Sequence, residues 1–113
     1  QRDLSVSHNK IGDVLVAQGD LPGALAAYRN GFEIGERLAK HDSQNTKWQR
    51  DLFVSQMKLA MVASTQKDRA AEQQHLRAAE RIIVPLLKLD PTNALWQRDG
   101  QLVRSRLRNV DAD

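Results

Sequence analysis

The chain has 113 residues, of which 41% are hydrophobic and 4% are aromatic, and its formal net charge is +3. This composition fits one globular domain and excludes a disordered or collagen-like chain. Cysteine is absent, which excludes disulfide bonds, thiol catalysis and cysteine-based zinc sites. No apolar run approaches the roughly 18–20 residues of a membrane span, so we expect no membrane contact and a cytoplasmic protein.

Helical spacing of the apolar residues predicts about five helices joined by short polar turns. They cover residues 1–18, 21–40, 46–66, 69–89 and 92–110. Asp20 and Asp68 are the expected N-caps of the second and fourth helices, and Thr92 or Asn93 that of the fifth. Pro85 is expected to kink the fourth helix or to convert its last turns, because it lacks an amide donor. Residues 111–113 are expected to fray.

One face of the second helix carries only small residues. They recur every four positions and are Gly23, Ala27, Gly31 and Gly35. Glycine inside a helix costs roughly 1 kcal/mol relative to alanine. Close approach of a neighbouring helix would offset this cost, and we therefore expect such a contact.

The chain repeats itself with a period of 48 residues, as Trp48-Gln49-Arg50-Asp51 returns as Trp96-Gln97-Arg98-Asp99. Placing residues 1–48 on 49–96 gives 17 identities. Such a period predicts stacked helical hairpins that bury a shared core. We expect one all-α domain, an antiparallel helical-hairpin solenoid with repeat 1 at 1–44, repeat 2 at 45–91 and a terminal helix at 92–110. Because Gln1 enters the repeat within its motif, we expect a fragment of a longer protein.

The repeated block lies where each first helix begins. Each tryptophan is expected to pack on the end of the preceding second helix, although it could also anchor an interface. The charges of the block are interpreted as helix-start charges and ion pairs between repeats. They are Arg50, Asp51, Arg98 and Asp99.

Residues 9–32 carry a pattern of large and small residues, with Ile11-Gly12 followed by Gly19, Ala24, Tyr28 and Gly31. This pattern resembles a tetratricopeptide repeat (TPR). His8 departs from it, the closing proline is absent, and the second repeat matches less well. The 48-residue period exceeds the usual, about 34 residues, and is similar to long-repeat variants in bacterial multidomain proteins. The resemblance implies a right-handed solenoid.

The resemblance also implies a non-catalytic scaffold for protein–protein interaction, in which the first helices line a concave groove for a peptide or protein segment. The motif places eight residues on that face: Val6, Asn9, Asp13, Val16, Val54, Met57, Met61 and Ser64. Leu102, Ser105 and Asn109 would extend it. Met57 and Met61 offer an adaptable apolar surface, or alternatively fill the core. Because they replace polar partners, a C-terminal carboxylate ligand is disfavoured.

Two other functions remain open from the sequence. A basic terminal helix with Arg104 and Arg108 one turn apart could contact nucleic-acid phosphates, but stacking aromatics are absent there. The same helix could mediate self-association, because we expect it to expose Leu102, Val103 and Leu107. No set of residues has the spacing of metal ligands or of a nucleophile and base. We therefore expect no metal, no cofactor and no enzymatic activity.

Overall fold

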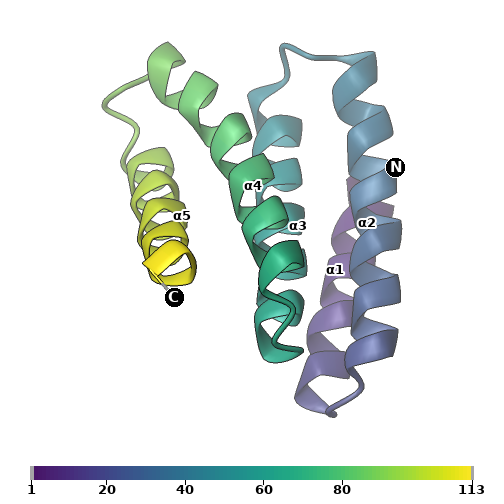
Figure 1. The fold of residues 1–113 in the computed structure, drawn as a ribbon. Helices are drawn as coiled ribbons and strands as arrows, with labels where there is room; N and C mark the ends of the chain where they lie inside the picture. Colours follow the sequence, from purple (N-terminus) through teal and green to yellow (C-terminus); the bar gives the residue numbers. More distant parts are fainter. Residues whose placement is uncertain (1, 113) are drawn as a thin grey trace.

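The computed structural model describes the backbone of residues 2–112 and the side chains of residues 4–112. Predictions about Gln1, the side chains of Arg2 and Asp3, and Asp113 lie outside the described residues. Within this range the chain is all-helical, with α1 (Arg2–Ala17), α2 (Leu21–His41), α3 (Thr46–Thr65), α4 (Arg69–Leu89) and α5 (Ala94–Ala112) (Figure 1). The all-α prediction is confirmed, and no described helix is long and apolar enough to cross a membrane.

Two turns of the same geometry close the hairpins. Asp20 caps α2 and Asp68 caps α4, because each side chain accepts a hydrogen bond from the backbone N–H three residues later, at 2.9 and 3.1 Å. Both turns contain a left-handed residue, Gly19 at φ 81° and Lys67 at φ 60°. The second turn therefore keeps its conformation without glycine, at a cost of about 1–2 kcal/mol for a residue with a side chain.

The repeated tryptophans lie in the first turn of a helix. Asn45 accepts the backbone N–H of Trp48 at 3.1 Å, and Asn93 accepts that of Trp96 at 3.0 Å. Asn93 is therefore the cap, whereas the Thr92 hydroxyl donates to the aspartate that ends α4. Trp96 packs against the core formed by α3, α4 and α5, whereas the predicted contact of each tryptophan with the end of the preceding helix stays a prediction.

Each helix packs against the next one in the chain, and α1 also contacts α3. The molecule measures 38 × 37 × 20 Å, and its smallest dimension is about two helix diameters. One core cluster joins α2 to α3 through Ala24, Tyr28, Leu59 and Val62. The other joins α3, α4 and α5, and it contains Phe53, Ala60, Leu76, Ala79, Ile83, Leu86, Val103, Leu107 and Val110. The second helix of each hairpin therefore lies between two first helices.

The small residues of α2 allow α1 to approach closely, as predicted. A Cβ on Gly31 would lie 2.9 Å from the Asn9 Oδ1 atom, and the Ser5 hydroxyl donates to the Gly31 carbonyl at 2.9 Å. On α1, a Cβ on Gly12 would collide with the ring of Tyr28. Gly31 on α2 and Gly12 on α1 are therefore required by the contact between these helices.

Of the two effects expected of Pro85, conversion of the last turns does not occur, because α4 stays α-helical through Pro85 to Leu89; the kink stays a prediction. Two expectations about α5 are wrong. Asp111 and Ala112 remain helical, since Arg77 donates to the Asp111 carboxylate at 3.1 Å. Val103 and Leu107 are 0% and 7% exposed, not open to solvent, because α4 covers them.

Candidate functional site

Asp13, one of the predicted groove residues, joins three helices. Its carboxylate accepts the Tyr28 hydroxyl at 2.5 Å and the Lys58 ammonium at 2.9 Å. Burial alone would raise the pKa of the Asp13 carboxyl, but the hydrogen bonds from Lys58 and Tyr28 hold it below its ordinary value. Burial, followed by the bond to Asp13, raises the pKa of the Tyr28 phenol. Asp13 therefore carries a charge that α2 and α3 already bind.

Asn9 also faces α3. Its amide nitrogen donates a hydrogen bond to the Ser55 hydroxyl at 3.4 Å. Its buried amide oxygen has no hydrogen-bond partner among the described residues. Together with the Asp13–Lys58 ion pair, this contact forms what we call the α1–α3 joint. The structure thus places Asn9 and Asp13 in contacts between helices.

Three of the four predicted residues of α3 line a hollow of about 250 Å³ between α3 and α5. We call it the α3–α5 groove. Val54, Met57 and Met61 form its apolar floor together with Phe53 and Leu102, and the charged groups around it are Arg50, Lys58, Asp99 and Arg106. Met57 and Met61 are half-buried and also pack against the two core clusters. Each methionine therefore both lines the groove and fills part of the core.

An ion pair between two copies of the repeated block lines this groove. Arg50 donates from Nε to Asp99 Oδ2 at 3.0 Å and from Nη2 to Oδ1 at 3.3 Å. The Asp99 side chain is only 10% exposed, and two parallel bonds fix the guanidinium and carboxylate planes. The predicted ion pair between repeats is confirmed here.

Comparison of equivalent positions in successive repeats shows how the groove differs from the α1–α3 joint. Lys58 pairs with Asp13 in the joint. Forty-eight residues later, Lys58 is replaced by Arg106 and Asp13 by Met61. Within the described part of the chain, Arg106 has no ion-pair partner, although it lines the groove beside Met61. The groove therefore combines an apolar floor with a cation that lacks a counter-charge.

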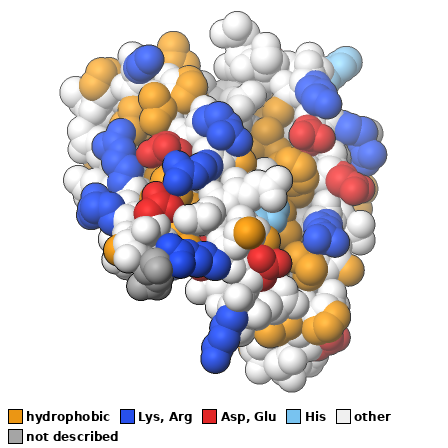
Figure 2. All heavy atoms as spheres, in the orientation of Figure 1, with side chains coloured by type: hydrophobic (Ala, Val, Ile, Leu, Met, Phe, Trp, Pro, Cys, Tyr) orange, Lys and Arg blue, Asp and Glu red, His pale blue; other side chains and the backbone are white. Residues whose placement is uncertain are grey.

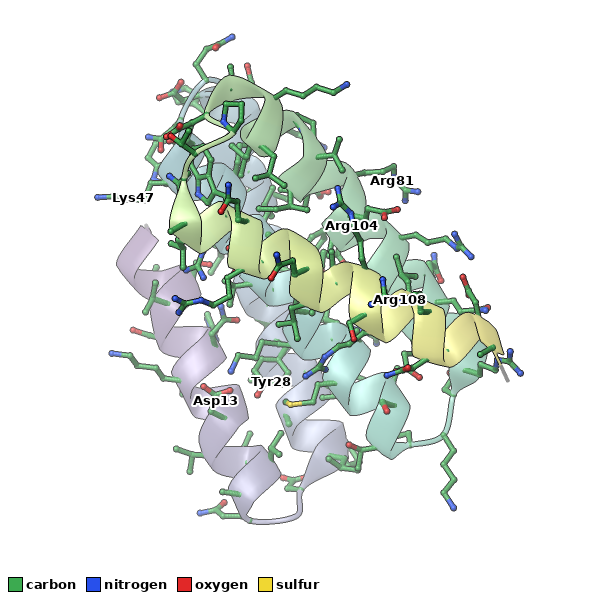
Figure 3. All side chains as sticks on the ribbon, turned by 90° about the vertical axis from the view of Figure 1, so that its left-hand side faces the viewer. Asp13, Tyr28, Lys47, Arg81, Arg104 and Arg108 are labelled. Carbon is green, nitrogen blue, oxygen red and sulfur yellow. The ribbon has the colours of Figure 1, made fainter. Side chains whose placement is uncertain are left out.

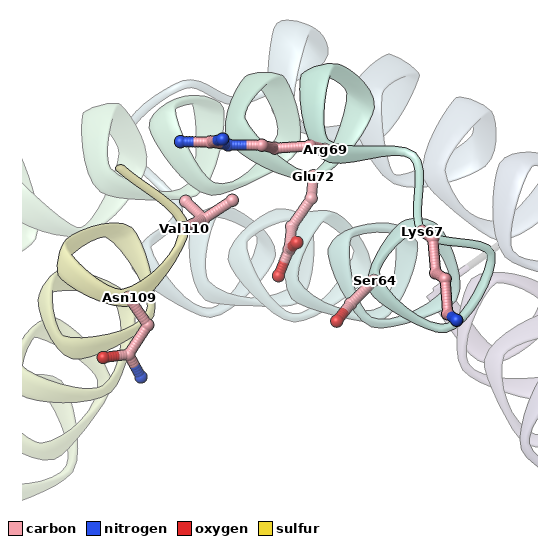
Figure 4. Close-up of a pocket in the computed structure, with 6 residues that line it drawn as sticks. All are labelled: Ser64, Lys67, Arg69, Glu72, Asn109 and Val110. Carbon is pink, nitrogen blue, oxygen red and sulfur yellow. The ribbon is translucent and has the colours of Figure 1, made fainter. Parts of the chain in front are cut away.

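The other predicted residues are distributed over several places. Val6 and Val16 on α1 are half-buried, and Val16 packs against the α2–α3 core cluster. Ser64 lines a separate polar hollow of about 370 Å³ with Glu72 and Asn109. Figure 4 shows this hollow between the ends of α3 and α5. The eight residues therefore do not line one hollow: only Val54, Met57 and Met61 share the α3–α5 groove.

The basic residues of α5 lie among acidic ones. Arg104 and Arg108 follow one another along the helix (Figure 3). They line a hollow between α4 and α5 with Arg77, Glu80 and Asp111. Arg77 is already paired with Asp111, and Figure 2 shows blue and red side chains mixed on this face. Nucleic-acid binding thus stays a prediction for which this face offers no unbroken basic surface.

His75 on α4 contacts a buried side chain of α3. Its Nδ1 atom lies 2.8 Å from the buried Gln56 side-chain oxygen. Burial, followed by the positive charge of Arg29, lowers the pKa of His75, although Asp68 opposes the shift. Because an amide oxygen can only accept, the Nδ1 atom of His75 is the donor of this hydrogen bond. No group of three or more His, Cys, Asp or Glu residues in the described chain has the geometry of a metal site.

Two parts of the site were not found from the sequence. The Asp13–Lys58 pair and the missing counter-charge of Arg106 depend on which helices are neighbours. Comparison of residues 48 positions apart gives a partial signal, because it shows Asp13 replaced by Met61 and Lys58 by Arg106, but it does not show that Asp13 and Lys58 are neighbours. No family model, no curated protein and no solved structure matches this chain.

Proposed function

We propose that the chain is a non-catalytic protein-interaction module of TPR-like architecture, in which the hairpins form a right-handed solenoid. The order of helix packing and the 48-residue repeat support this architecture. In it the first helices α1, α3 and α5 form the side that meets a partner. The α3–α5 groove is the part of that side that binds a peptide segment.

The observation that carries the proposal is the change from the α1–α3 joint to the α3–α5 groove. In the joint, Asn9 and Asp13 satisfy Ser55 and Lys58 across two first helices. In the groove, Met57 and Met61 occupy the positions 48 residues after Asn9 and Asp13. They leave an apolar hollow beside Arg106. Methionine adapts to irregular apolar partners, and an arginine without a counter-charge attracts a carboxylate.

The ligand that fits is a peptide with an apolar side chain next to an aspartate or glutamate. The apolar side chain would occupy the hollow over Met57 and Met61. The acidic side chain would pair with Arg106 at the edge of the groove. A hollow of about 250 Å³ accommodates one or two side chains, so we expect recognition of a short motif.

The test is selection of peptides from a random library on the immobilised chain, followed by affinity measurements on the selected peptides. We expect Met57→Glu to weaken their binding at least ten-fold, since it places a charge in the apolar floor. Arg106→Glu, at an exposed position, should reverse the preference from acidic to basic peptides. Leu89→Glu is the matched control, because Leu89 is exposed and does not line the groove.

Circular dichroism establishes that each variant is folded before its affinity is compared. Selected peptides that bind all three variants as tightly as the original chain would exclude the groove as the binding site. Selected peptides without acidic residues would remove the role of Arg106.

A further inference from the structure

Both sulfur atoms of this chain lie in the floor of the α3–α5 groove. The sequence contains two methionines and no cysteine, and Met57 and Met61 both line the hollow. They lie about one turn apart on α3, and both are half-buried. Because a thioether is readily oxidised to a sulfoxide, a small oxidant that enters the groove meets the most oxidisable groups of the chain there.

The preceding repeat shows what a polar atom at the position of Met61 would meet. Forty-eight residues earlier stands Asp13, whose carboxylate accepts a hydrogen bond from the Lys58 ammonium at 2.9 Å. Arg106 stands 48 residues after Lys58 and lines the groove together with Met61. An oxygen on the Met61 side chain would therefore face Arg106 as Asp13 faces Lys58.

The surroundings of Met57 differ in this respect. Met57 corresponds to Asn9, whose amide nitrogen donates to the Ser55 hydroxyl. The residue 48 positions after Ser55 is Val103, which is 0% exposed and belongs to the core cluster against which Met57 packs. An oxygen on Met57 would therefore meet apolar side chains, whereas an oxygen on Met61 would meet a cation.

We propose that Met61 is a site of reversible oxidation that switches off the α3–α5 groove, with hydrogen peroxide as the oxidant. The sulfur lone pair forms a bond to one peroxide oxygen, and the O–O bond breaks. The proton on the transferred oxygen moves to the other oxygen, which leaves as water. The thioether thereby loses two electrons and becomes a sulfoxide, and the peroxide gains them. A dithiol reductant reverses the change, since it is oxidised to a disulfide while the sulfoxide oxygen leaves as water.

Oxidation changes the groove in two ways, and their effect on a ligand rests on the proposed function. A thioether sulfur is only a weak acceptor, whereas the sulfoxide makes the floor of the groove polar and less favourable for an apolar side chain. The sulfoxide oxygen also accepts a hydrogen bond from Arg106, which then competes with the acidic side chain of the ligand. The oxidised groove thus resembles the α1–α3 joint, where Asp13 and Lys58 bind each other.

The test uses Met57→Leu, in which Met61 is the one remaining sulfur. Leucine nearly conserves the volume of methionine, and circular dichroism verifies the fold. Hydrogen peroxide should add one oxygen atom to this variant, measured by mass spectrometry, and none to Met57→Leu/Met61→Leu. Each protein is compared with itself before and after treatment, so that the effect of the substitutions on affinity cancels. Acidic peptides selected on the groove should bind at least ten-fold more weakly to oxidised Met57→Leu, whereas treatment of the double variant should not change its affinity.

A measurement without peptide tests the hydrogen bond from Arg106. The melting temperature of Met57→Leu is measured before and after oxidation, alone and combined with Arg106→Ala. Oxidation should lower it further in the combined variant, because the sulfoxide oxygen then lacks its donor. Arg104→Ala is the matched control, since Arg104 is exposed on the same helix and lies outside the groove. It should leave the effect of oxidation unchanged.

Three results would overturn the proposal. The first is that folded Met57→Leu gains no oxygen under conditions that oxidise free methionine. The second is an equal effect of oxidation on the melting temperature with and without Arg106, which would exclude the hydrogen bond. The third is an unchanged peptide affinity after oxidation, which would exclude the switch. If no peptide were selected at all, the proposed function of the groove and the switch would both be refuted, while the mass and melting measurements would still decide the oxidation of Met61 and its bond to Arg106.

Discussion

Removal of the Tyr28 side chain tests the packing of α2 against α1 and α3. Tyr28 is 0% exposed and lies between α1 and α3, with Gly12 against its ring and Asp13 accepting a hydrogen bond from its hydroxyl. Tyr28→Ala removes the ring and the hydrogen bond together. Tyr28→Phe removes only the hydroxyl and leaves the contact with Gly12 in place.

The expected losses of unfolding free energy differ between the two variants. Truncation of a buried aromatic residue costs about 3–5 kcal/mol, and a hydrogen bond to a charged acceptor contributes about 1.5–3 kcal/mol. Asp13 retains Lys58 and is partly exposed, so we expect Tyr28→Phe to cost about 1–2 kcal/mol, toward the lower end. For a domain of this size, about 4 °C of melting temperature correspond to 1 kcal/mol.

Urea denaturation followed by circular dichroism measures both losses, with Leu89→Ala as the control. Leu89 is 72% exposed, and its truncation should change the unfolding free energy by less than about 0.5 kcal/mol. If Tyr28→Ala were no more destabilising than Leu89→Ala, the assigned position of Tyr28 in the core would be wrong. If Tyr28→Phe and Tyr28→Ala were equally destabilising, the ring would contribute nothing through packing.

Three further predictions concern the turn, the buried histidine and the inter-repeat ion pair. Lys67→Gly should raise the unfolding free energy by about 1 kcal/mol, because Lys67 has a left-handed conformation. Gly19→Ala should lower it by a similar amount. Urea melts in which both variants changed the unfolding free energy in the same direction would contradict this prediction. His75 has a pKa below its ordinary value in the folded chain. As the pH falls, the unfolded chain therefore takes up this proton before the folded chain does, and stability should decrease below about pH 6.5. His75→Gln should remove this loss, and an unchanged pH profile would show that the loss has another origin. A double-mutant cycle with Arg50→Gln and Asp99→Asn should give a coupling of about 1–2 kcal/mol, because two hydrogen bonds join the pair; purely additive losses would show that the pair adds nothing to stability.

The helices and their caps could be predicted because their signals are local. Asp20 and Asp68 each cap a helix that begins with the next residue, so the cap needs no knowledge of the tertiary structure. The same holds for Asn93, three residues before Trp96. Local hydrogen bonding therefore explains why the helix limits agree with the sequence prediction.

Contacts between helices were predicted less well, because periodicity shows that a face is apolar but not which neighbour covers it. Val103 and Leu107 were assigned to an open end of the molecule, whereas α4 buries them. Asn9 was assigned to ligand binding, whereas its amide faces Ser55. Val54, Met57 and Met61 were predicted to share one face and do line one hollow, because they lie on consecutive turns of one helix.

The pairing of Arg50 with Asp99 has a consequence for how such a protein is extended in evolution. The arginine comes from one copy of the four-residue block and the aspartate from the next copy. A single block therefore encodes both halves of a connection, one directed toward the preceding repeat and one toward the following repeat. Duplication of a 48-residue segment supplies its own ion pair at the new boundary, without any further substitution.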